Sequence, residues 1–569
     1  MNAYQPITAD MFWLLQQVLK GPEQVRALPP FGDIDAELMQ QVLDEAGKFV
    51  GEVIAPLNRD GDEIGCRFEQ GAVITPPGFR DAYQAFWQAG WPALSAAPED
   101  GGQGLPSVLE AMLYEMLCGA NHGWTMAPGL LHGAYECIKH HASDELKARF
   151  LSKVATGEWL ATMCLTEPHA GSDLGLARTR ATPLPDGRYA LNGTKIFISG
   201  GEHDLSDNIV HLVLARLPDA PPGPRGLSLF LVPKFYEDGS RSAVHCERIE
   251  EKMGLHGSAT CVMRFDDAAS WIVGQPGKGL NAMFIMMNAA RLHVAMQGIG
   301  LLDAAWQKAD AYARERRQMR APGRKASPAE ADLIIEHPAV QRMLDTQRAW
   351  VDGGRLLAYR TGIELDRIRH ADPAQAEIAQ RWCTLVTPVL KAAWTHQAFH
   401  GGSECLQVFG GHGYVREWGI EQILRDARVA MIYEGTNEIQ AIDLLVRKIV
   451  PDGANSLNAL LDELSPDLDA GGRARLKRLR QCTAQVVAAA AQDAALAYRV
   501  ADDYLRAFTL VLLDWAWQRI DSALTADTPH LASRWQAPAR ALRTWVLPEG
   551  DMRCGIIASI VESPSPVRA

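Results

Sequence analysis

Apolar residues recur three and four positions apart over long parts of the chain, which is the spacing of an amphipathic helix. Segments such as "DAELMQQVLDEAGKFVGEVIAPLN" show it within residues 36–160, between breaks rich in Pro and Gly. Because long helices joined by short turns favour a bundle, we expect residues 281–450 to form one. The helical stretches of that region are 281–320, 337–369, 373–408 and 419–450.

The pattern changes between these two helical regions. Residues 161–280 contain short runs rich in β-branched and aromatic residues, divided by Gly, Pro, Asn and Asp. The runs include "KIFISGG", "IVHLVLARL", "GLSLFLVPK" and "ATCVMRFDDA". Such runs are typical of an antiparallel sheet or barrel, so the middle of the chain is predicted to be a β-barrel domain.

Both ends of the chain extend beyond these regions. The N-terminal residues hold a short apolar cluster, which we interpret as an amphipathic docking segment, and the Ala- and Arg-rich tail reads as an additional helical domain. The basic run of the tail can mark a solvated helix face, an intersubunit packing surface or a contact with a membrane surface. The expected fold class is multidomain α+β, with domains at 1–35, 36–160, 161–280, 281–450 and 451–569.

Composition and charge narrow the class of protein. The 569 residues carry a net charge of −12, which argues against nucleic acid or an anionic membrane as the main partner. The chain has no Lys or Arg before Lys20, so it lacks the basic start of a signal peptide, and no apolar run is long enough for an integral membrane segment. The ten cysteines include no CxxC pair and fit free thiols in a reducing compartment, so we expect a cytoplasmic protein.

Several common chemistries lack their motif in this sequence. The chain has no GxSxG nucleophile elbow and no HExxH motif, and its histidines show no metal-ligand spacing, so no metal site is expected. No GxGxxG follows a strand and opens a helix, and "FGGHGY" at 409–414 has a different glycine spacing and follows a helix. A nucleotide cofactor would therefore have to bind in another way.

A polar loop and a short strand of the β region are candidates for ligand binding. The loop "MCLTEPHAGSDLG" at 163–175 gathers hydroxyl groups and flexible backbone that can hydrogen-bond a polar ligand, although a cluster of β-turns has the same composition. In "KIFISGG", Phe197 and Ser199 are two positions apart, so an alternating strand places both on one face, where they can meet a flat ring.

Two segments of the second helical region carry charge in unusual places. "RERRQMR" at 314–320 gathers cations at the predicted end of a helix, where they suit the helix dipole, solvent or an anionic phosphate. Glu434 lies in "MIYEGTNEIQ" on a turn between two helices, next to Gly435, which can bend sharply. Asn437 is the expected N-cap, with Gln440 three residues on. By itself, the turn is also compatible with a plain helix connection.

Taken together and in this order, the motifs resemble those of the acyl-CoA dehydrogenases over residues 36–450. "LTEPHAGSD" resembles the flavin and acyl-CoA loop of that family, and "KIFISGG" resembles the strand that flanks the isoalloxazine ring. "ERRQM" resembles its Arg-x-Gln segment, "QVFGGHGY" its adenine-dinucleotide loop and "YEGTNEIQ" the segment with the catalytic base. The resemblance implies non-covalent FAD at a subunit interface, an acyl-CoA substrate, electron-transfer flavoprotein as the acceptor, and a homodimer or a dimer of dimers.

The resemblance also assigns roles to individual residues. Glu434 would remove the α-proton of the thioester while the β-hydrogen leaves as hydride to flavin N5. Some relatives carry the base near the arginine that corresponds to Arg291, but "MMNAARLHV" has no carboxylate here. Arg316 and Gln318 would reach the FAD pyrophosphate from the neighbouring subunit. The expected FAD contacts are Met163, Leu165, Thr166, Phe197, Ser199, Arg316, Gln318, Gln407, Gly410, Gly411 and Thr436, and the expected substrate contacts are Ser172, Arg291, Tyr433 and Gly435.

The sequence departs from the family pattern in places. Phe197 stands where many relatives have Trp, and Met319 where Phe followed by Gly is common, just before the insertion "RAPGRKASPAEADLIIEHP". The extension, insertion and tail resemble a longer bacterial branch with 3-methylmercaptopropionyl-CoA and broad-range fatty acyl-CoA dehydrogenases. The alternatives are an acyl-CoA oxidase that uses dioxygen and a non-catalytic acyl-CoA-binding scaffold. A nitroalkane-oxidase-like activity is disfavoured, because we would expect Asp as its base.

Overall fold

The computed structural model describes residues 4–323, 329–524 and 529–562. Part of the insertion noted above, residues 324–328, therefore lies outside the described residues. The chain divides into two compact units, one of Lys48–His293 and the other of Met1–Gly47 with Val294–Ala569. We call them the β-containing unit and the helical unit.

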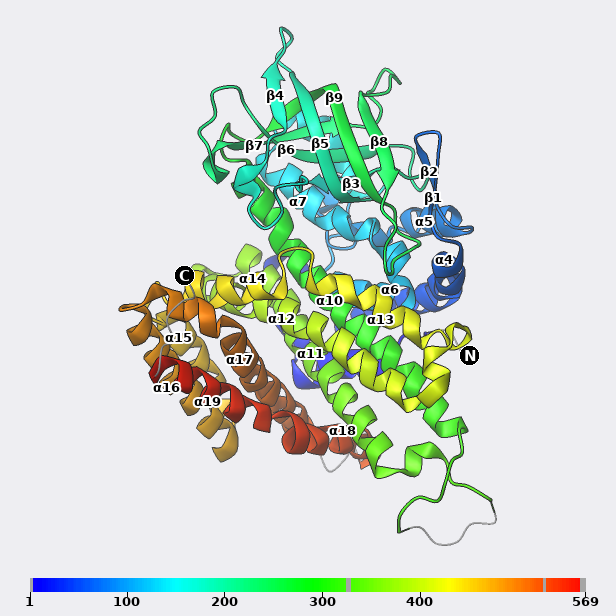
Figure 1. Ribbon diagram of the computed structural model, residues 1–569, viewed down its shortest axis with the longest axis vertical. Coiled ribbons are helices and arrows are strands. Elements are labelled where there is room, and N and C mark those ends of the chain that lie inside the picture. The colour runs from blue at the N-terminus through cyan, green and yellow to red at the C-terminus, as the bar shows by residue number, and fades with distance from the viewer. Residues whose placement is uncertain (1–3, 324–328, 525–528, 563–569) are drawn as a thin grey trace. The chain divides into compact units, whose positions relative to one another are not determined.

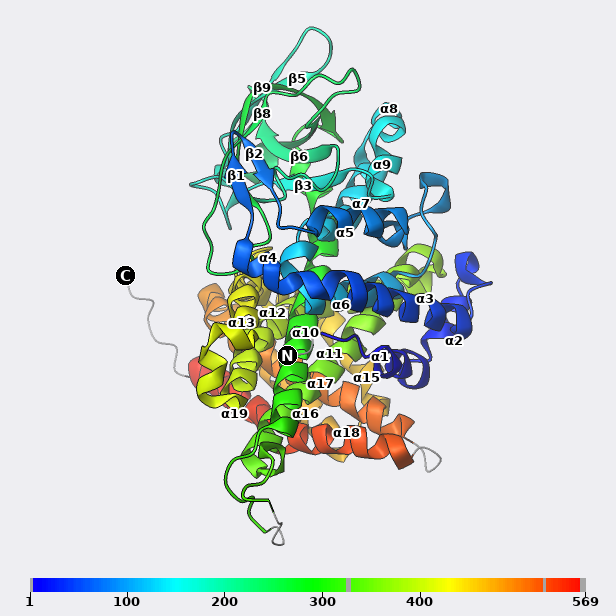
Figure 2. The same cartoon turned by 90° about the vertical axis from the view of Figure 1, so that its right-hand side faces the viewer.

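The β-containing unit begins with helices, as the apolar spacing predicts. They are α4 (Asn58–Ile64), α5 (Phe79–Gln88), α6 (Ser107–Thr125), α7 (Leu131–His141), α8 (Asp144–Leu146) and α9 (Ser152–Ala155). A hairpin of β1 (Arg67–Glu69) and β2 (Ala72–Ile74) lies between α4 and α5 (Figure 2). Every residue of α6 is buried, which fits a helix that is largely apolar on all sides.

The predicted β-barrel is confirmed by the strand pairings of this unit. Its strands are β3 (Leu160–Cys164), β4 (Arg180–Pro183), β5 (Tyr189–Ser199), β6 (Ile209–Arg216), β7 (Leu227–Pro233), β8 (Val244–Ile249) and β9 (Thr260–Val273). β4 pairs with β5, β5 with β9, β9 with β7, β7 with β6, and β6 again with β4, so the pairing closes on itself (Figure 1). β3 adds to β6, and β8 adds to β9. All of β7 is buried, because its run is almost continuously apolar.

The helical unit contains the predicted bundle. Its long helices are α10 (Gly279–Glu315), which starts in the other unit, α11 (Pro338–His370) and α12 (Pro373–Val408), followed by α13 (Ile420–Arg428) and α14 (Asn437–Ile442). The bounds of α12 agree with the predicted 373–408. The expectation that the first of these helices reaches residue 320 is wrong. Residues after Glu315 pair instead with a later segment: the Gln318 amide donates to Asp332 O and the Ile334 amide donates to Arg316 O.

Both ends of the chain pack within the helical unit. The N-terminal segment forms α1 (Thr8–Trp13), a π-helical turn and α2 (Gly21–Arg26), and Trp13 stacks on Trp535 at a ring distance of 4.7 Å, which confirms that it docks. α3 (Ala36–Phe49) follows. The tail forms α15 (Asn455–Leu464), α16 (Ala470–Ala490), α17 (Ala494–Ala523), α18 (Pro529–Ala541) and α19 (Pro548–Glu562). None of the described helices combines the length and the hydropathy needed to cross a bilayer.

The basic run of the tail lies on α16, and three of its arginines form ion pairs within the chain. Arg475 pairs with Asp514, Arg478 with Asp551, and Arg480 with Asp462. Of the three possibilities left open by the sequence, these ion pairs of partly exposed arginines favour the solvated helix face over a membrane contact.

Candidate active site

The polar loop after β3 is fastened to β5 by a buried ion pair. Glu167 is 4% exposed and accepts hydrogen bonds from Lys195 Nζ at 2.8 Å, from Thr179 Oγ1 at 2.6 Å and from the Arg178 amide at 2.7 Å. Lys195 Nζ also donates to Leu165 O at 2.9 Å. The loop is thus held at both of its ends.

Both members of this pair have perturbed pKa values. Burial acts to raise the pKa of Glu167, but the Lys195 ammonium and the hydrogen bonds from Thr179 and Arg178 lower it to about 2. Burial lowers the pKa of Lys195, against the opposing effect of Glu167. Sequence reasoning missed this pair. Its signal was a lysine at the start of the apolar run "KIFI" of a predicted strand, where a buried charge needs a partner.

The predicted flavin-ring residues of this unit lie around the start of the loop and the end of β5. Met163, Leu165 and Thr166 are half-buried, and the Ile196 amide donates to Thr166 O at 2.9 Å. This bond ties the loop to the strand beside Phe197. Two predicted substrate contacts belong to the same unit, Ser172 on the exposed part of the loop and Arg291, which is buried on α10.

The simple alternation predicted for β5 is interrupted by a bulge. The register of β5 against β9 shifts between Lys195 and Ile198, and Phe197 has a φ of +60°. A left-handed conformation costs a residue other than Gly about 1–2 kcal/mol. Phe197 is nevertheless 60% exposed, Ser199 is half-buried, and Ile198 between them is buried at 2% exposed. Both predicted residues are therefore more exposed than Ile198 between them, although the bulge interrupts the alternation from which their common face was predicted.

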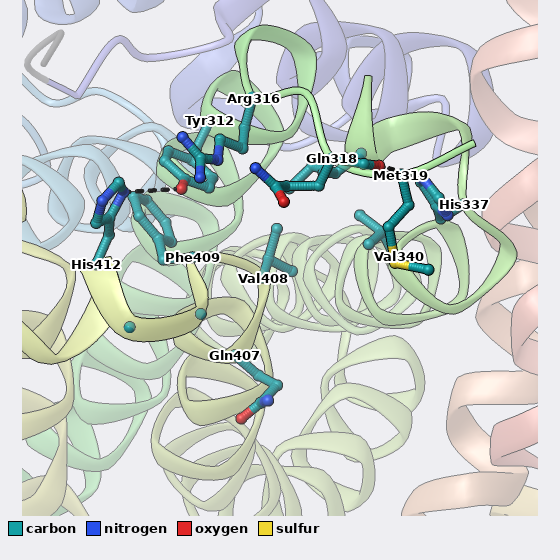
Figure 3. Close-up of a pocket in the computed structure, with 13 residues that line it drawn as sticks. Tyr312, Arg316, Gln318, Met319, His337, Val340, Gln407, Val408, Phe409 and His412 are labelled. Carbon is teal, nitrogen blue, oxygen red and sulfur yellow. Dashed lines mark hydrogen bonds between the residues drawn. The ribbon is translucent and has the colours of Figure 1, made fainter. Parts of the chain in front are cut away.

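In the helical unit, five predicted FAD contacts come together in one pocket. A pocket of about 590 Å³ is lined by residues from the end of α10, from the segment after it and from the glycine-rich loop after α12 (Figure 3). The five are Arg316, Gln318, Gln407, Gly410 and Gly411. Figure 3 shows Arg316 and Gln318 on one side of the pocket and the side chain of Gln407 directed away from them. The pair Arg316 and Gln318 is about ninety positions away in sequence from the group of Gln407, Gly410 and Gly411.

An aromatic cluster that sequence reasoning missed forms another wall of this pocket. Tyr312 stacks on Phe409 at 4.3 Å, and its hydroxyl lies 2.9 Å from His412 Nδ1 (Figure 3). His412 in turn stacks on Trp418 at 4.5 Å. A helical spacing cannot reveal this cluster, because Tyr312 comes from α10 and the other residues from the loop after α12.

The chemistry of the pocket suits the diphosphate and adenosine part of a dinucleotide. A Cβ added at Gly410 or Gly411 would meet nothing within 4 Å, so both glycines border open space. Arg316 supplies a cation, and His337 and Val340 bring the N-terminal end of α11 to the pocket. Phosphate groups are favoured at both kinds of site.

Glu434 lies on a strained turn between α13 and α14. Its φ is +55°, and that of Gly435 is +80°. Thr436, and not Asn437 as predicted, is the N-cap of α14: its hydroxyl accepts from the Ile439 amide at 3.3 Å, while Asn437 is the first helical residue. A Cβ at position 435 would lie 2.8 Å from Gln440 Nε2, which explains the glycine.

The side chains beside Glu434 are also fixed. Gln440 is buried and does not reach back to the cap amide, as a capping box would require. Its Nε2 donates instead to Glu434 O at 3.0 Å and to Gly435 O at 3.2 Å. The Tyr433 hydroxyl donates to Gln297 Oε1. Glu434 itself is half-buried, so it is accessible to a ligand while its backbone is held.

This fold and these sites define the class of protein. Family models for the N-terminal, middle and C-terminal domains of acyl-CoA dehydrogenases match residues 37–158, 162–268 and 277–449. The chain belongs to the acyl-CoA dehydrogenase family, whose members are FAD flavoproteins and oxidoreductases that act on CH–CH groups.

Individual relatives are similar over nearly the whole chain. The 3-methylmercaptopropionyl-CoA dehydrogenase of Ruegeria pomeroyi is 41% identical over 95% of this chain and 91% of its own. The broad-specificity linear acyl-CoA dehydrogenase FadE5 of Mycobacterium tuberculosis is 33% identical over 93% of both. The fold also matches an acyl-CoA dehydrogenase complexed with FAD from Bacillus anthracis, with a TM-score of 0.65 at 21% identity, over 96% of this chain and 98% of that one.

Proposed function

We propose that the protein dehydrogenates an acyl-CoA thioester between its α and β carbons to give the trans-2-enoyl-CoA, with Glu434 as the base. The observation that carries this proposal is the turn itself. In the segment that resembles the family's catalytic segment, a carboxylate residue has a left-handed conformation, and a hydrogen bond from Gln440 holds its carbonyl. Strain of this kind collects at functional sites.

The chemistry explains why such a turn is useful. The α-proton of a thioester is far less acidic than a carboxyl group, so the base must be desolvated and must lie within hydrogen-bonding reach of the α-carbon. Glu434 is half-buried in the chain alone, and a bound acyl chain would remove further water from it. The enolate-like charge on the thioester oxygen needs a preorganised donor, and the backbone amide of Glu434 would supply it. Tyr433, Gly435, Ser172 and Arg291 would contact the substrate.

FAD, when bound, supplies the acceptor for the hydride that leaves the β-carbon. Thr166 and Ser199 would hydrogen-bond its ring system, Met163, Leu165 and Phe197 would contact the ring, and Thr436 would reach the cofactor beside Glu434. The pocket of the helical unit would hold the pyrophosphate through Arg316 and Gln318 and the adenosine end through Gln407, Gly410 and Gly411. In this proposal the pocket serves the FAD of a neighbouring subunit in a homodimer or a dimer of dimers.

The similarity to the Ruegeria and Mycobacterium enzymes supports 3-methylmercaptopropionyl-CoA or a linear fatty acyl-CoA as substrate. The acceptor of the electrons would be electron-transfer flavoprotein. An acyl-CoA oxidase would consume dioxygen during turnover without an added acceptor, and an oxygen electrode distinguishes the two.

The test is an anaerobic titration of the flavin-loaded full chain with butyryl-, octanoyl-, palmitoyl-, isobutyryl- and 3-methylmercaptopropionyl-CoA, followed by the bleaching of the flavin absorbance. We expect bleaching in the wild type and none in Glu434→Gln. Glu438→Gln is the matched control, because Glu438 is an exposed carboxylate of the same segment. The proposal would be refuted if none of the thioesters bleached the flavin of the wild type. It would also be refuted if the flavin of Glu434→Gln bleached at the wild-type rate.

A further inference from the structure

The turn that carries Glu434 rests on a buried lysine of another helix. Lys391 lies in the middle of α12 and is 0% exposed. Its Nζ donates to Gly435 O at 2.8 Å and to Asn437 Oδ1 at 3.0 Å. A lysine of α12 thus reaches both the residue after the proposed base and the first residue of α14.

Asn437 is the second part of this support. Its amide Nδ2 donates to Ala392 O, on α12, at 3.1 Å, while its Oδ1 accepts from Lys391 and lies 3.1 Å from Thr395 Oγ1. The side chain of Asn437 is therefore occupied by α12, which also explains why Thr436 and not Asn437 caps α14.

The Gly435 carbonyl accepts from two donors that belong to different helices. Lys391 Nζ reaches it from α12, and Gln440 Nε2 reaches it from α14. Fixing this carbonyl fixes the peptide plane between Gly435 and Thr436, and the bond from Gln440 to Glu434 O fixes the plane before it. The two peptide planes that follow Glu434 are thus held by groups of α12 and α14, and with them the ψ angle of Glu434 and the φ and ψ angles of Gly435.

We propose that Lys391 is a positioning residue: its ammonium group, together with Asn437, holds the backbone of the turn so that the Glu434 carboxylate is presented to the substrate in one orientation. This inference rests on the proposed function of Glu434. Lys391 acts through the backbone and takes no proton from the substrate. An ammonium suits this task, because it offers three donors and can satisfy a carbonyl and an amide oxygen together.

The test compares Lys391→Met with Lys448→Met in the flavin-loaded full chain. Lys448 is the control, since its Nζ also donates to a backbone carbonyl of α12, Thr384 O at 2.9 Å, and its described ion pair is with Asp443, which follows α14. Rapid mixing with the acyl-CoA that bleaches the wild type best gives the rate of bleaching and the dissociation constant of the thioester. We expect the rate to fall about 100-fold in Lys391→Met, as for a displaced catalytic group, with little change in the dissociation constant. Lys391→Gln keeps two N–H donors on a shorter side chain and should recover part of the rate.

Hydrogen exchange of peptides that cover residues 432–442 gives a readout that does not depend on activity. We expect faster exchange there in Lys391→Met than in Lys448→Met. If Lys391→Met does not fold, Asn437→Ala removes the other half of the support and should give the same two signatures. If the wild type bleaches and Lys391→Met bleaches at the same rate, the positioning role is refuted but the proposed function is not. The same holds if the rate falls equally in Lys391→Met and Lys448→Met. Absence of bleaching in the wild type would instead refute the proposed function, and the exchange data would still show whether Lys391 holds the turn.

Discussion

Removing either partner of the ion pair between Glu167 and Lys195 should destabilise the loop and β5, and we expect the two removals to cost different amounts of free energy. In Glu167→Gln, Lys195 is left as a buried ammonium, 0% exposed, without its counter-charge and with only neutral described acceptors, the Leu165 carbonyl and the new amide oxygen. In Lys195→Met, the Glu167 carboxylate keeps its bonds from the Thr179 hydroxyl and from the amides of Arg178 and Thr179. The carboxylate is therefore the better supported of the two charges when its partner is removed.

Breaking a buried ion pair by removing one partner costs about 3–5 kcal/mol. We place Glu167→Gln near the upper end of this range and Lys195→Met near the lower end. At about 1.4 kcal/mol per factor of ten, the loop and β5 should open roughly 10²- to 10⁴-fold more often. The double variant Glu167→Gln/Lys195→Met buries no charge at either position, so it should cost less than the sum of the single variants.

The assay is hydrogen exchange with mass spectrometry on peptides that cover the loop at 165–179 and β5. Acidification provides an independent check. The pKa of Glu167 falls from its ordinary value of 4.5 to about 2 in the folded chain, so its contribution is present above pH 4.5 and is lost as the pH falls towards 2. The variants that lack Glu167 should lack this part of the acid sensitivity. Wild-type exchange in both single variants, or fully additive losses in the double variant, would refute the reasoning.

Two further predictions concern the dinucleotide pocket and the barrel core. Arg316→Ala should weaken the binding of FAD to the apoprotein about 10- to 100-fold, because it removes a charge-assisted bond, whereas Arg317→Ala should not, since Arg317 does not line the pocket and donates to Ala331 O. A fluorescence titration measures both affinities, and equal losses would contradict the assigned contact. Burial, aided by Lys234 and Arg241, lowers the pKa of His211 from its ordinary 6.5 to about 3, so stability should fall between these pH values as the unfolded chain takes up the proton. His211→Gln should remove about 1.4 kcal/mol per pH unit of that fall, measured by thermal unfolding from pH 6.5 to 5, and an unchanged slope would contradict the burial argument.

The parts of the fold that follow from local rules could be predicted from the sequence. The bounds of α12 agree with the prediction because Asp372 caps its start, Pro373 occupies the first turn and a glycine-rich loop follows its end. The apolar runs of residues 161–280 likewise predict the strands of the barrel. The resemblance to the family also named, from the sequence, five of the residues that line the pocket of the helical unit.

The remaining features depend on groups that are distant in sequence. α10 ends at Glu315 because the residues after it pair with the segment at 332–334, and no local signal marks that pairing. Thr436 and Asn437 are both good N-cap residues, and the choice between them is made by Lys391, 46 positions away along the chain. The bulge in β5 could not be predicted from local sequence either, because a bulky residue such as Phe197 rarely adopts a positive φ.

The N-terminal segment and the C-terminal tail take part in one network of buried ion pairs with the bundle. Arg534 of α18 donates to Asp10 of α1 at 2.9 Å and to Asp352 of α11 at 2.8 Å. Asp352 also accepts from Arg348, which pairs with Asp303 of α10 at 2.8 Å. Removal of either end would leave buried charges of the bundle without a partner that they have in the full chain, at a cost of several kcal/mol. The extension and the tail are therefore part of the structure that holds α10 and α11. Since α10 leads to the cation-rich segment of the pocket and α11 begins at its edge, the described residues of both ends support the proposed cofactor site although they are not among those that line the pocket.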